Sequence, residues 1–290
     1  MDIHGFLNAQ QLPSSYAEIA QKWFIPLCER LLKHQEGAAK PFIVGINGCQ
    51  GSGKSTLTSF IEAFLSSTHN KHIVSLSIDD FYLDQSDRNA LAVKVHPLLK
   101  TRGVPGTHDV PLALDTFRQL KAGETTKLPR FNKATDNPFP KAQWPVVDTT
   151  PDVIILEGWC VGVEPEPASS LKKPINSLEE EKDPLATWRT FVNEALRDKY
   201  QALFNQLDYR VMLEAPSFDC VYKWRLEQEH KLAKSSAANS KGVMSDDEVA
   251  NFVQHYQRIT ESALGTMPAK CDTVFTLDSS RSIIEQDVRK

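Results

Sequence analysis

Short apolar runs rich in β-branched residues alternate along this chain with longer segments of mixed polarity. Most of these runs hold too few polar residues for a half-exposed antiparallel strand, so they indicate parallel strands covered on both faces. Apolar residues recur at helical spacing over 16–35, 56–66 and 246–264, with Ser245 and Asp246 as candidate caps of the last helix. The five runs are Phe42–Ile46, Ile73–Ile78, Val153–Leu156, Tyr209–Leu213 and Thr273–Leu277. Strands separated by helices predict a doubly wound α/β sheet.

Two stretches interrupt this alternation. Residues 83–150 are rich in Pro, Gly and Asp, which predicts a mostly irregular insertion between the second and third strands. Residues 164–184 are charged and rich in proline, which predicts an exposed loop. Because long loops in a compact domain are usually functional or disordered, we expect the insertion to bind substrate and the later loop to be plain surface. The whole chain, 1–290, is predicted to form one domain that includes the N-terminal helix over 16–35.

Composition narrows the class of protein. The chain is 41% hydrophobic and 24% charged with a net charge of −4, values typical of a globular protein without an electrostatic signature for nucleic acid or anionic membranes. Its five scattered cysteines form no CxxC pair, which disfavours a zinc site or a disulfide framework. Neither a signal peptide nor a membrane-spanning run is visible. We expect a soluble protein of the cytoplasm, with the nucleus as a second possible location, and no nucleic-acid or membrane partner. The sequence does not determine the oligomeric state, although we favour a monomer.

The strongest chemical signal follows the first strand. Residues 48–56 read GCQGSGKST and match the phosphate-binding loop (P-loop) pattern G-x-x-x-x-G-K-[ST], with a strand before and a helix after. Glycines let backbone N–H groups turn toward phosphate oxygens, and the helix N-terminus adds positive potential. Lys54 suits the β- and γ-phosphates, and the Ser55 hydroxyl suits Mg²⁺. The predicted nucleotide-binding residues are Gly48, Cys49, Gln50, Gly51, Ser52, Gly53, Lys54, Ser55 and Thr56.

Carboxylates follow the next two strands. Asp79 and Asp80 end the second strand, and Glu157 followed by Gly158 ends the third. Ligands of open α/β sheets bind along this edge, so the aspartates could accept the proton of an acceptor hydroxyl or hold Mg²⁺ through water. Glu157 could hold Mg²⁺ in the same way, which makes Ser55, Asp79 and Glu157 the predicted metal ligands. The alternative is that these acidic residues merely end strands.

Two clusters in the insertion are candidates for an anionic substrate. Residues 102–109 (RGVPGTHD) are dense in turn residues, and residues 130–133 (RFNK) combine two cations with an amide. Each cluster is equally consistent with an ordinary surface loop. The predicted substrate-binding residues are Asp80, Tyr82, Arg102, His108, Asp109, Arg130 and Lys133.

A charged helical stretch after the fourth strand leads into a Ser-, Ala- and Gly-rich segment at 235–242. This layout over 219–242 suits a mobile lid whose Arg225 reaches the phosphates on closure and stabilises charge in the transition state. A solvated helix face explains the same pattern equally well.

In this order, the P-loop, DDFY, RGVPGTHD, LPRFNKATD, ILEGWCVG and the WRLEQEHKL and MSDDEV stretches resemble the glycerate kinase family. That family is similar to the uridine kinase, phosphoribulokinase and pantothenate kinase group of P-loop kinases. The resemblance covers about residues 15–280. It implies a P-loop NTPase fold with a five-stranded parallel sheet in the order 2-3-1-4-5, helices on both faces and an insertion between strands 2 and 3. It also implies ATP-dependent transfer of the γ-phosphate to a metabolite hydroxyl, with Mg²⁺.

The resemblance also implies roles for single residues. By it, Asp79 is the catalytic base with Asp80 as its neighbour, and Glu157 with Gly158 forms the strand-end pair. The substrate segments fall on His108 and Asp109 and on Phe131 and Asn132. With Lys54 from the P-loop pattern and Arg225 from the lid layout, the predicted catalytic set is Asp79, Lys54, Glu157 and Arg225. Plant-type members carry a GRGDR stretch at the place of residues 134–144, which contain no arginine. An arginine that could pair with a substrate carboxylate is therefore missing there, and the identity of the phosphate acceptor stays open.

Two other functions fit less well. A regulatory GTPase would need N-K-x-D, but Asn132-Lys133-Ala134-Thr135-Asp136 is one residue too long and precedes the third strand, which no D-x-x-G follows. The intact set of Lys54, Ser55, Asp79 and Glu157 argues against an ATP-binding regulatory protein that has lost turnover, and that function stays open as an alternative. The nucleotide preference, ATP or GTP, and the choice between Asp79 and Asp80 as base stay open.

Overall fold

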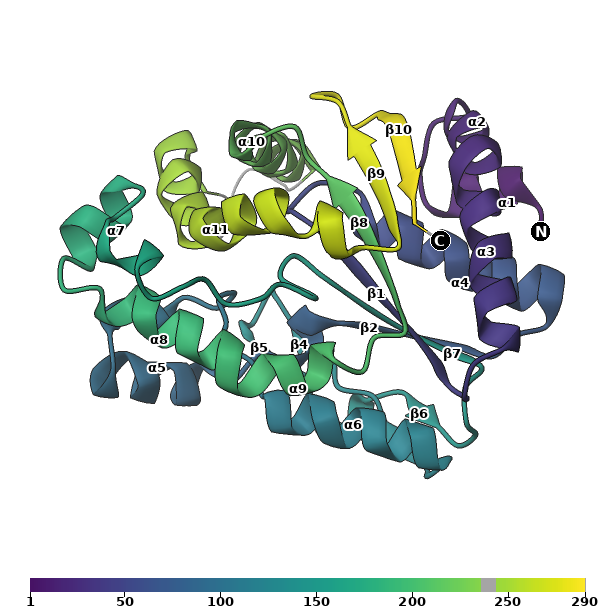
Figure 1. Cartoon of the computed structure of the whole chain (residues 1–290), viewed down its shortest axis with the longest axis horizontal. Coiled ribbons are helices and arrows are strands. Elements are labelled where there is room, and N and C mark those ends of the chain that lie inside the picture. Colours follow the sequence, from purple (N-terminus) through teal and green to yellow (C-terminus); the bar gives the residue numbers. More distant parts are fainter. Residues whose placement is uncertain (236–243, 290) are drawn as a thin grey trace.

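The computed structural model describes residues 1–235 and 244–289, with side chains described outside 231–243 (Figure 1). Residues 236–242 of the predicted lid and flexible segment therefore lie outside the described residues. A six-stranded sheet in the order β10-β9-β8-β1-β7-β2 forms the centre. Its strands are β1 (Phe42–Gly48), β2 (Ile73–Ser77), β7 (Val153–Gly158), β8 (Tyr209–Glu214), β9 (Thr273–Leu277) and β10 (Ile283–Val288).

The predicted strands and their order are confirmed. The five predicted runs are β1, β2, β7, β8 and β9, all parallel, in the order β2-β7-β1-β8-β9. Every residue of β1 and β7 is buried, as expected for strands covered on both faces. The sequence analysis missed β10, which pairs antiparallel with β9 at the sheet edge and contains only half-buried and exposed residues. Its half-exposed pattern lacks the apolar run that marked the other strands.

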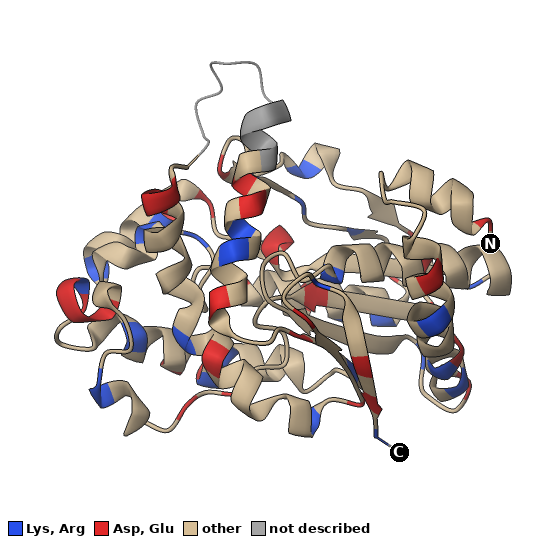
Figure 2. Ribbon diagram, turned by 90° about the horizontal axis from the view of Figure 1, so that it is seen from above, with Lys and Arg blue, Asp and Glu red and all other residues tan. Residues whose placement is uncertain are grey.

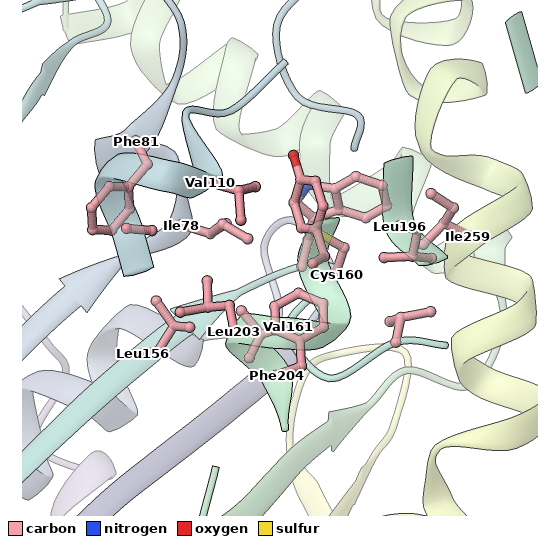
Figure 3. Close-up of a cluster of buried hydrophobic side chains, with 14 of the residues drawn as sticks. Ile78, Phe81, Val110, Leu156, Cys160, Val161, Leu196, Leu203, Phe204 and Ile259 are labelled. Carbon is pink, nitrogen blue, oxygen red and sulfur yellow. The ribbon is translucent and has the colours of Figure 1, made fainter. Parts of the chain in front are cut away.

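Helices cover both faces of the sheet. One hydrophobic core lies between the sheet and three helices, α3 (Ile25–Glu36), α4 (Lys54–His69) and α10 (Phe218–Ser235) (Figure 1). A second lies under α6 (Val110–Ala122), α8 (Thr187–Ala195), α9 (Gln201–Phe204) and α11 (Asp246–Thr266) (Figures 1 and 3). Figure 3 shows Leu156 and Val161 from the sheet side of the second core packed with Leu203 and Phe204. The helices outside the insertion are α1 (Ile3–Ala9), α2 (Tyr16–Ile19), α3 (Ile25–Glu36), α4 (Lys54–His69), α7 (Ser177–Lys182), α8 (Thr187–Ala195), α9 (Gln201–Phe204), α10 (Phe218–Ser235) and α11 (Asp246–Thr266).

The three helices expected from apolar spacing all form. A π-helical turn over Ala20–Phe24 joins α2 to α3, so that Tyr16–Glu36 is one continuous helical segment. Pro26 comes directly after this turn, where the i→i−4 hydrogen-bond pattern is already interrupted. Ser245 caps α11, and a reciprocal bond between its backbone N–H and the Glu248 side chain completes a capping box.

The insertion is more regular than predicted. It contains α5 (Gln85–Lys94), α6 (Val110–Ala122) and four two-residue strands, and its strands are β3 (Thr126–Lys127), β4 (Phe131–Asn132), β5 (Asn137–Pro138) and β6 (Val146–Val147). Asp84 accepts a hydrogen bond from Asp87 N (2.8 Å) and caps α5. The Asp and Pro residues that suggested irregular chain are in part helix caps and first-turn prolines, which corrects the prediction.

The stretch 164–184 is not the plain exposed loop that was predicted. It includes α7, and the side chains of Glu179 and Asp183 are buried. Arg258 Nη2 donates to Glu179 Oε2 (2.6 Å), and Arg189 Nη1 donates to Asp183 Oδ2 (2.9 Å). Two of the charges that suggested solvent exposure, those of Glu179 and Asp183, are instead paired in the interior with arginines from α8 and α11, whereas most other charged residues of the stretch are exposed.

The described surface carries charges of both signs. Figure 2 shows Lys and Arg interspersed with Asp and Glu over the face seen from above. All five cysteines are buried and unbridged, as the reduced state predicted from their spacing requires. No helix among the described residues has the length and apolarity needed to cross a membrane.

Candidate active site

A cavity of about 810 Å³ opens where β1, β2 and β7 end, at the carboxyl edge of the sheet. Residues 50–56 form its middle. What we call the insertion end is lined by Asp79, Tyr82, Arg102, Lys133, Trp159, Arg225, Phe252 and Tyr256. What we call the hairpin end is lined by Leu12, Pro13, Ser15, Tyr16, Ile19, Ser280, Arg281 and Ser282. Of the residues that the sequence predicted, the cavity brings together residues 50–56, Asp79, Tyr82, Arg102, Lys133 and Arg225.

The glycine-rich segment leaves β1 and enters α4 at Lys54, in the context that the pattern predicts. Gly51 and Gly53 have φ values of 80° and 94°, in the left-handed region that only glycine adopts without strain. A Cβ on Gly51 would lie 2.8 Å from Trp224 Cβ, so α10 packs directly against the loop. The backbone thus wraps tightly enough to turn N–H groups toward a phosphate.

Two residues of the predicted phosphate-binding set do not line the cavity. A Cβ on Gly48 would lie 2.5 Å from Ser52 Oγ and 3.2 Å from Leu213 Cβ, so the strand end has no room for a side chain. The Cys49 side chain is buried, and burial raises the pKa of its thiol to about 12. The side chains of this part of the loop therefore support it from behind, and a contact of the Gly48 or Cys49 backbone with a phosphate stays a prediction.

Glu157 lies beside the first turn of α4. Ser55 Oγ donates to Glu157 Oε1 over 3.4 Å, and Lys54 Nζ lies 3.9 Å from Glu157 Oε2. This second carboxylate oxygen is buried and accepts no hydrogen bond from the described residues. The unpartnered carboxylate oxygen of Glu157 and the nearby hydroxyl of Ser55 are both hard oxygen ligands, which is the kind of ligand that Mg²⁺ prefers. Because the described residues hold no cluster of three or more His, Cys, Asp or Glu, phosphate oxygens and water would have to supply the other ligands.

Asp79 presents an ionised carboxylate to the insertion end. It lies in a short 3₁₀ turn after β2, where Tyr82 Oη donates to its Oδ1 (2.7 Å) and Lys133 Nζ donates to its Oδ2 (2.7 Å). Burial raises the pKa of Asp79, but the charge of Lys133 and these hydrogen bonds outweigh it, and the net pKa is lowered. The carboxylate is therefore available to accept a hydrogen bond from a hydroxyl group.

Buried rings hold Tyr82 in place. The His108 ring stacks on Tyr82 with centroids 4.6 Å apart, and His108 Nδ1 is hydrogen-bonded to Tyr200 Oη (2.6 Å). Burial lowers the pKa of His108 to about 4, so the imidazole is neutral at physiological pH. His108 lies outside the cavity and supports Tyr82, which corrects the prediction that it contacts substrate.

Three other predicted substrate-binding residues have structural partners outside the cavity. Asp80 Oδ2 accepts hydrogen bonds from Ser77 N (3.2 Å) and Arg130 Nη1 (3.2 Å), which caps the 3₁₀ turn. Asp109 Oδ1 accepts a hydrogen bond from Leu112 N (3.0 Å) and caps α6. Asp80, Arg130 and Asp109 therefore stabilise the turns that carry the site, and a contact of any of the three with substrate stays a prediction.

The cations of the insertion end are paired with carboxylates. Arg102 pairs with Asp136, and Lys133 pairs with Asp79. The buried Arg88 also donates to Asp136 Oδ2 (2.8 Å). In a guanine-reading loop the corresponding Lys and Asp would face the base, whereas here Lys133 and Asp136 bind protein groups at the insertion end. This placement agrees with the earlier argument against a GTPase.

Arg225 of α10 faces the cavity rather than solvent. It pairs with the buried Glu229, and its guanidinium lies 5.8 Å from the centroid of the Phe252 ring. The solvated helix face considered for this stretch is thus excluded for Arg225. The closure of a lid over 219–242 stays a prediction.

Sequence reasoning missed the aromatic wall of the insertion end. Trp159 Nε1 donates to Gly103 O (3.1 Å), Tyr256 Oη donates to Arg102 O (3.0 Å), and the two rings meet edge to face at 5.0 Å. Gly103 has φ 131°, and a Cβ there would overlap the Tyr256 hydroxyl, so the loop reaches the ring only as glycine. Trp159 and Tyr256 lie in apolar sequence patterns, which predict only that they belong to the hydrophobic core, and no local motif indicates a place in the site.

Comparisons with known proteins agree with this geometry. Residues 43–171 match the model of the phosphoribulokinase/uridine kinase family. The uncharacterized kinase mug58 of Schizosaccharomyces pombe is 37% identical over 83% of this chain and 87% of its own length. The chloroplastic D-glycerate 3-kinase of Arabidopsis thaliana is 32% identical over 79% of this chain and 49% of its own length. The solved structure of D-glycerate 3-kinase from Cryptococcus neoformans has the same fold, with a TM-score of 0.76, 23% identity and coverage of 92% of this chain and 99% of that one.

Proposed function

This chain belongs to the phosphoribulokinase/uridine kinase family and is a phosphotransferase, and from that premise we propose that it transfers the γ-phosphoryl group of ATP to a hydroxyl of a small carboxylated metabolite. The resemblance to the glycerate kinases that the motifs suggested is confirmed by these relatives. One observation carries the proposal: a single cavity holds the P-loop and, at its insertion end, the ionised Asp79 among cations. The name of the plant relative makes D-glycerate the first acceptor to test.

The middle of the cavity would hold the phosphates of ATP. The backbone N–H groups of residues 50–56 and the N-terminus of α4 supply positive potential, and Lys54 adds a full charge. Ser55 and Glu157 would hold Mg²⁺, with Asp79 reached through water, and the ion would neutralise charge on the β- and γ-phosphate oxygens. Phosphoryl transfer depends mainly on such positioning and charge stabilisation.

The insertion end would hold the acceptor. An acceptor hydroxyl that donates to Asp79 would have its oxygen directed at the γ-phosphorus; the new O–P bond forms as the bond to the β-phosphate oxygen breaks, and Asp79 takes the proton. Lys133, now bonded to Asp79, would then pair with a carboxylate of the same acceptor. Arg102 and Lys133 thus offer cations in place of the arginine that residues 134–144 lack. Arg225, on the cavity wall, is placed to stabilise the transferred group.

Acceptor-dependent ADP formation tests this proposal. The purified chain, with ATP and Mg²⁺, is assayed with D-glycerate, other small hydroxy acids, pantothenate and uridine, and Lys54→Ala serves as the inactive control. We expect ADP release that depends on a hydroxy acid and is lost in Lys54→Ala. ATP binding without ADP release for any acceptor would make the chain a nucleotide-binding protein without turnover. A preference for acceptors that lack a carboxylate would contradict the assigned substrate class.

A further inference from the structure

Asp136 does not line the cavity, but it pairs with a cation that does. Its Oδ1 accepts a hydrogen bond from Arg102 Nη1, and Arg102 lines the insertion end. We propose that Asp136 is a specificity-determining residue, which acts through Arg102 and makes the insertion end reject acceptors that carry a second negative charge. This inference rests on the proposed function, because it needs an acceptor carboxylate beside Arg102.

A buried arginine fixes the Asp136 carboxylate in this position. Arg88 is 2% exposed, and its Nη2 donates both to Asp136 Oδ2 (2.8 Å) and to Asp136 O (2.9 Å). The same guanidinium also donates to Leu83 O (3.2 Å) and Lys100 O (3.2 Å), which hold it in place. Because the loss of one partner leaves a buried charge uncompensated, Arg88 ties Asp136 to its place beside Arg102.

The turn between β4 and β5 presents charges of both signs at the insertion end. Lys133, at the start of this turn, donates to Asp79, and Asp136, at its end, accepts from Arg102. Asp136 has φ 55°, in the left-handed region that few residues other than glycine adopt and that aspartate tolerates better than most. One short turn therefore carries both a cation for the acceptor and the carboxylate that moderates the charge of Arg102.

The charge balance around Arg102 matches a single carboxylate. Asp136 is shared by Arg88 and Arg102, so these three side chains have one positive charge in excess. Each of the other cations that line the insertion end already has its own carboxylate, in the pairs Lys133–Asp79 and Arg225–Glu229. Arg102 bonds to Asp136 through one nitrogen, so its remaining N–H groups can bind an acceptor carboxylate. A second carboxylate on the acceptor would find no excess positive charge and would be repelled by Asp136.

Two acceptor analogues that differ by one carboxylate test the inference. Threonate and tartrate have the same four-carbon chain, but tartrate has a second carboxylate in place of a primary alcohol. The Ki of each is measured in competition with the hydroxy acid that the wild type phosphorylates fastest. Asp136→Asn keeps the shape and removes the charge, so the Ki of tartrate should fall roughly 10-fold, the effect expected of one unit charge at an effective dielectric constant of about 20. The Ki of threonate should change far less.

Two control variants separate charge from stability. Asp87→Asn removes an equal charge from an exposed residue of α5 that does not line the cavity, and it should change neither Ki. Asp136→Glu keeps the charge and should keep the preference for threonate. A variant that only loosened the fold would shift both Ki values together, so the ratio of the two is the quantity that reports specificity.

The outcomes separate this inference from the proposed function. If Asp136→Asn leaves the ratio of the two Ki values unchanged while the wild type phosphorylates a hydroxy acid, the inference is wrong and the proposed function stands. A wild type that phosphorylates no hydroxy acid would overturn both. Should Asp136→Asn not fold, the wild type and Arg102→Gln decide. Threonate should bind the wild type more tightly than tartrate, and Arg102→Gln should raise the Ki of threonate roughly 10-fold with kcat retained. Failure of either result would contradict the inference.

Discussion

The middle and the insertion end of the cavity are built in different ways. The middle is one continuous segment, residues 50–56, whose backbone and helix N-terminus do most of the work expected of it. The insertion end is assembled from side chains of distant segments, among them Asp79, Arg102, Lys133 and Tyr256. A site made of backbone depends on local glycine spacing, whereas a site made of side chains depends on which way each one turns in the folded chain.

Adjacent aspartates show the consequence. Asp79 and Asp80 share one short turn, yet Asp79 lines the cavity and Asp80 turns back to Ser77 N and Arg130. Residue type and position alone do not separate the two. The comparison therefore predicts that substitutions in the insertion end divide sharply into those that affect catalysis and those that affect only stability.

The largest effect is expected for Asp79. Asp79→Asn keeps the shape and removes the proton acceptor, so turnover should fall roughly 10²- to 10⁴-fold while the Kd for ATP is retained. The matched control is Asp80→Asn, which should keep turnover near wild type and lower the melting temperature, because Arg130 loses an ionised partner. Steady-state kinetics and calorimetry on both variants check this. The reverse result would give the role of base to Asp80.

The next effect concerns the middle of the cavity. Lys54→Ala should weaken ATP binding roughly 100-fold, because a hydrogen bond to a charged group contributes about 1.5–3 kcal/mol. Lys71→Ala, beyond the far end of α4, removes an equal charge that bonds to Gln35 and should leave the Kd unchanged. Titration calorimetry measures both. An unchanged Kd in Lys54→Ala would contradict the phosphate assignment.

The pH dependence of turnover sharpens the account of Asp79. Lys133 helps to lower the pKa of Asp79, so the ionised base persists as pH falls below the usual range of an aspartate. Lys133→Ala removes that charge while burial still raises the pKa of Asp79, so the acid limb of the kcat/KM profile, which reports the free enzyme, should move to higher pH. The exposed Lys127, outside the cavity, is the control, and Lys127→Ala should leave the limb in place. A limb that does not move would show that Asp79 does not control it.

The smallest effect is expected for Asp109. Asp109→Ala removes the cap of α6 and should lower the free energy of unfolding by about 1 kcal/mol, without changing the KM of the acceptor. Denaturant unfolding and kinetics measure the two quantities. A raised KM with unchanged stability would place Asp109 in the substrate site and break the division drawn above.

The sheet was predictable because its strands are distinct in sequence. Fully buried strands such as β1 and β7 must be apolar throughout, and their order followed from the resemblance. The stretch 83–150 was misjudged because its Asp and Pro residues are in part caps and first-turn residues of helices. The stretch 164–184 was misjudged because its buried charges have partners far away in sequence. Glu179, for example, finds Arg258 on α11.

The candidate site was predictable where chemistry is local. The P-loop is visible as a spacing of glycines, Lys54 and Ser55, but the supporting roles of Gly48 and Cys49 depend on how closely other segments approach. Trp159 and Tyr256 lie in apolar patterns that indicate only core. Their place in the cavity follows from the fold and is not encoded in any short motif.

The central claim is that a phosphoryl group crosses this cavity from ATP to a hydroxyl. Phosphorus NMR tests it most directly, with the wild-type chain, ATP, Mg²⁺ and the hydroxy acid that gives the fastest ADP release. The account predicts a new phosphomonoester in amounts equal to the ADP formed, with no matching release of inorganic phosphate. Inorganic phosphate equal to ADP, without a phosphomonoester, would show hydrolysis instead of transfer and would contradict the claim.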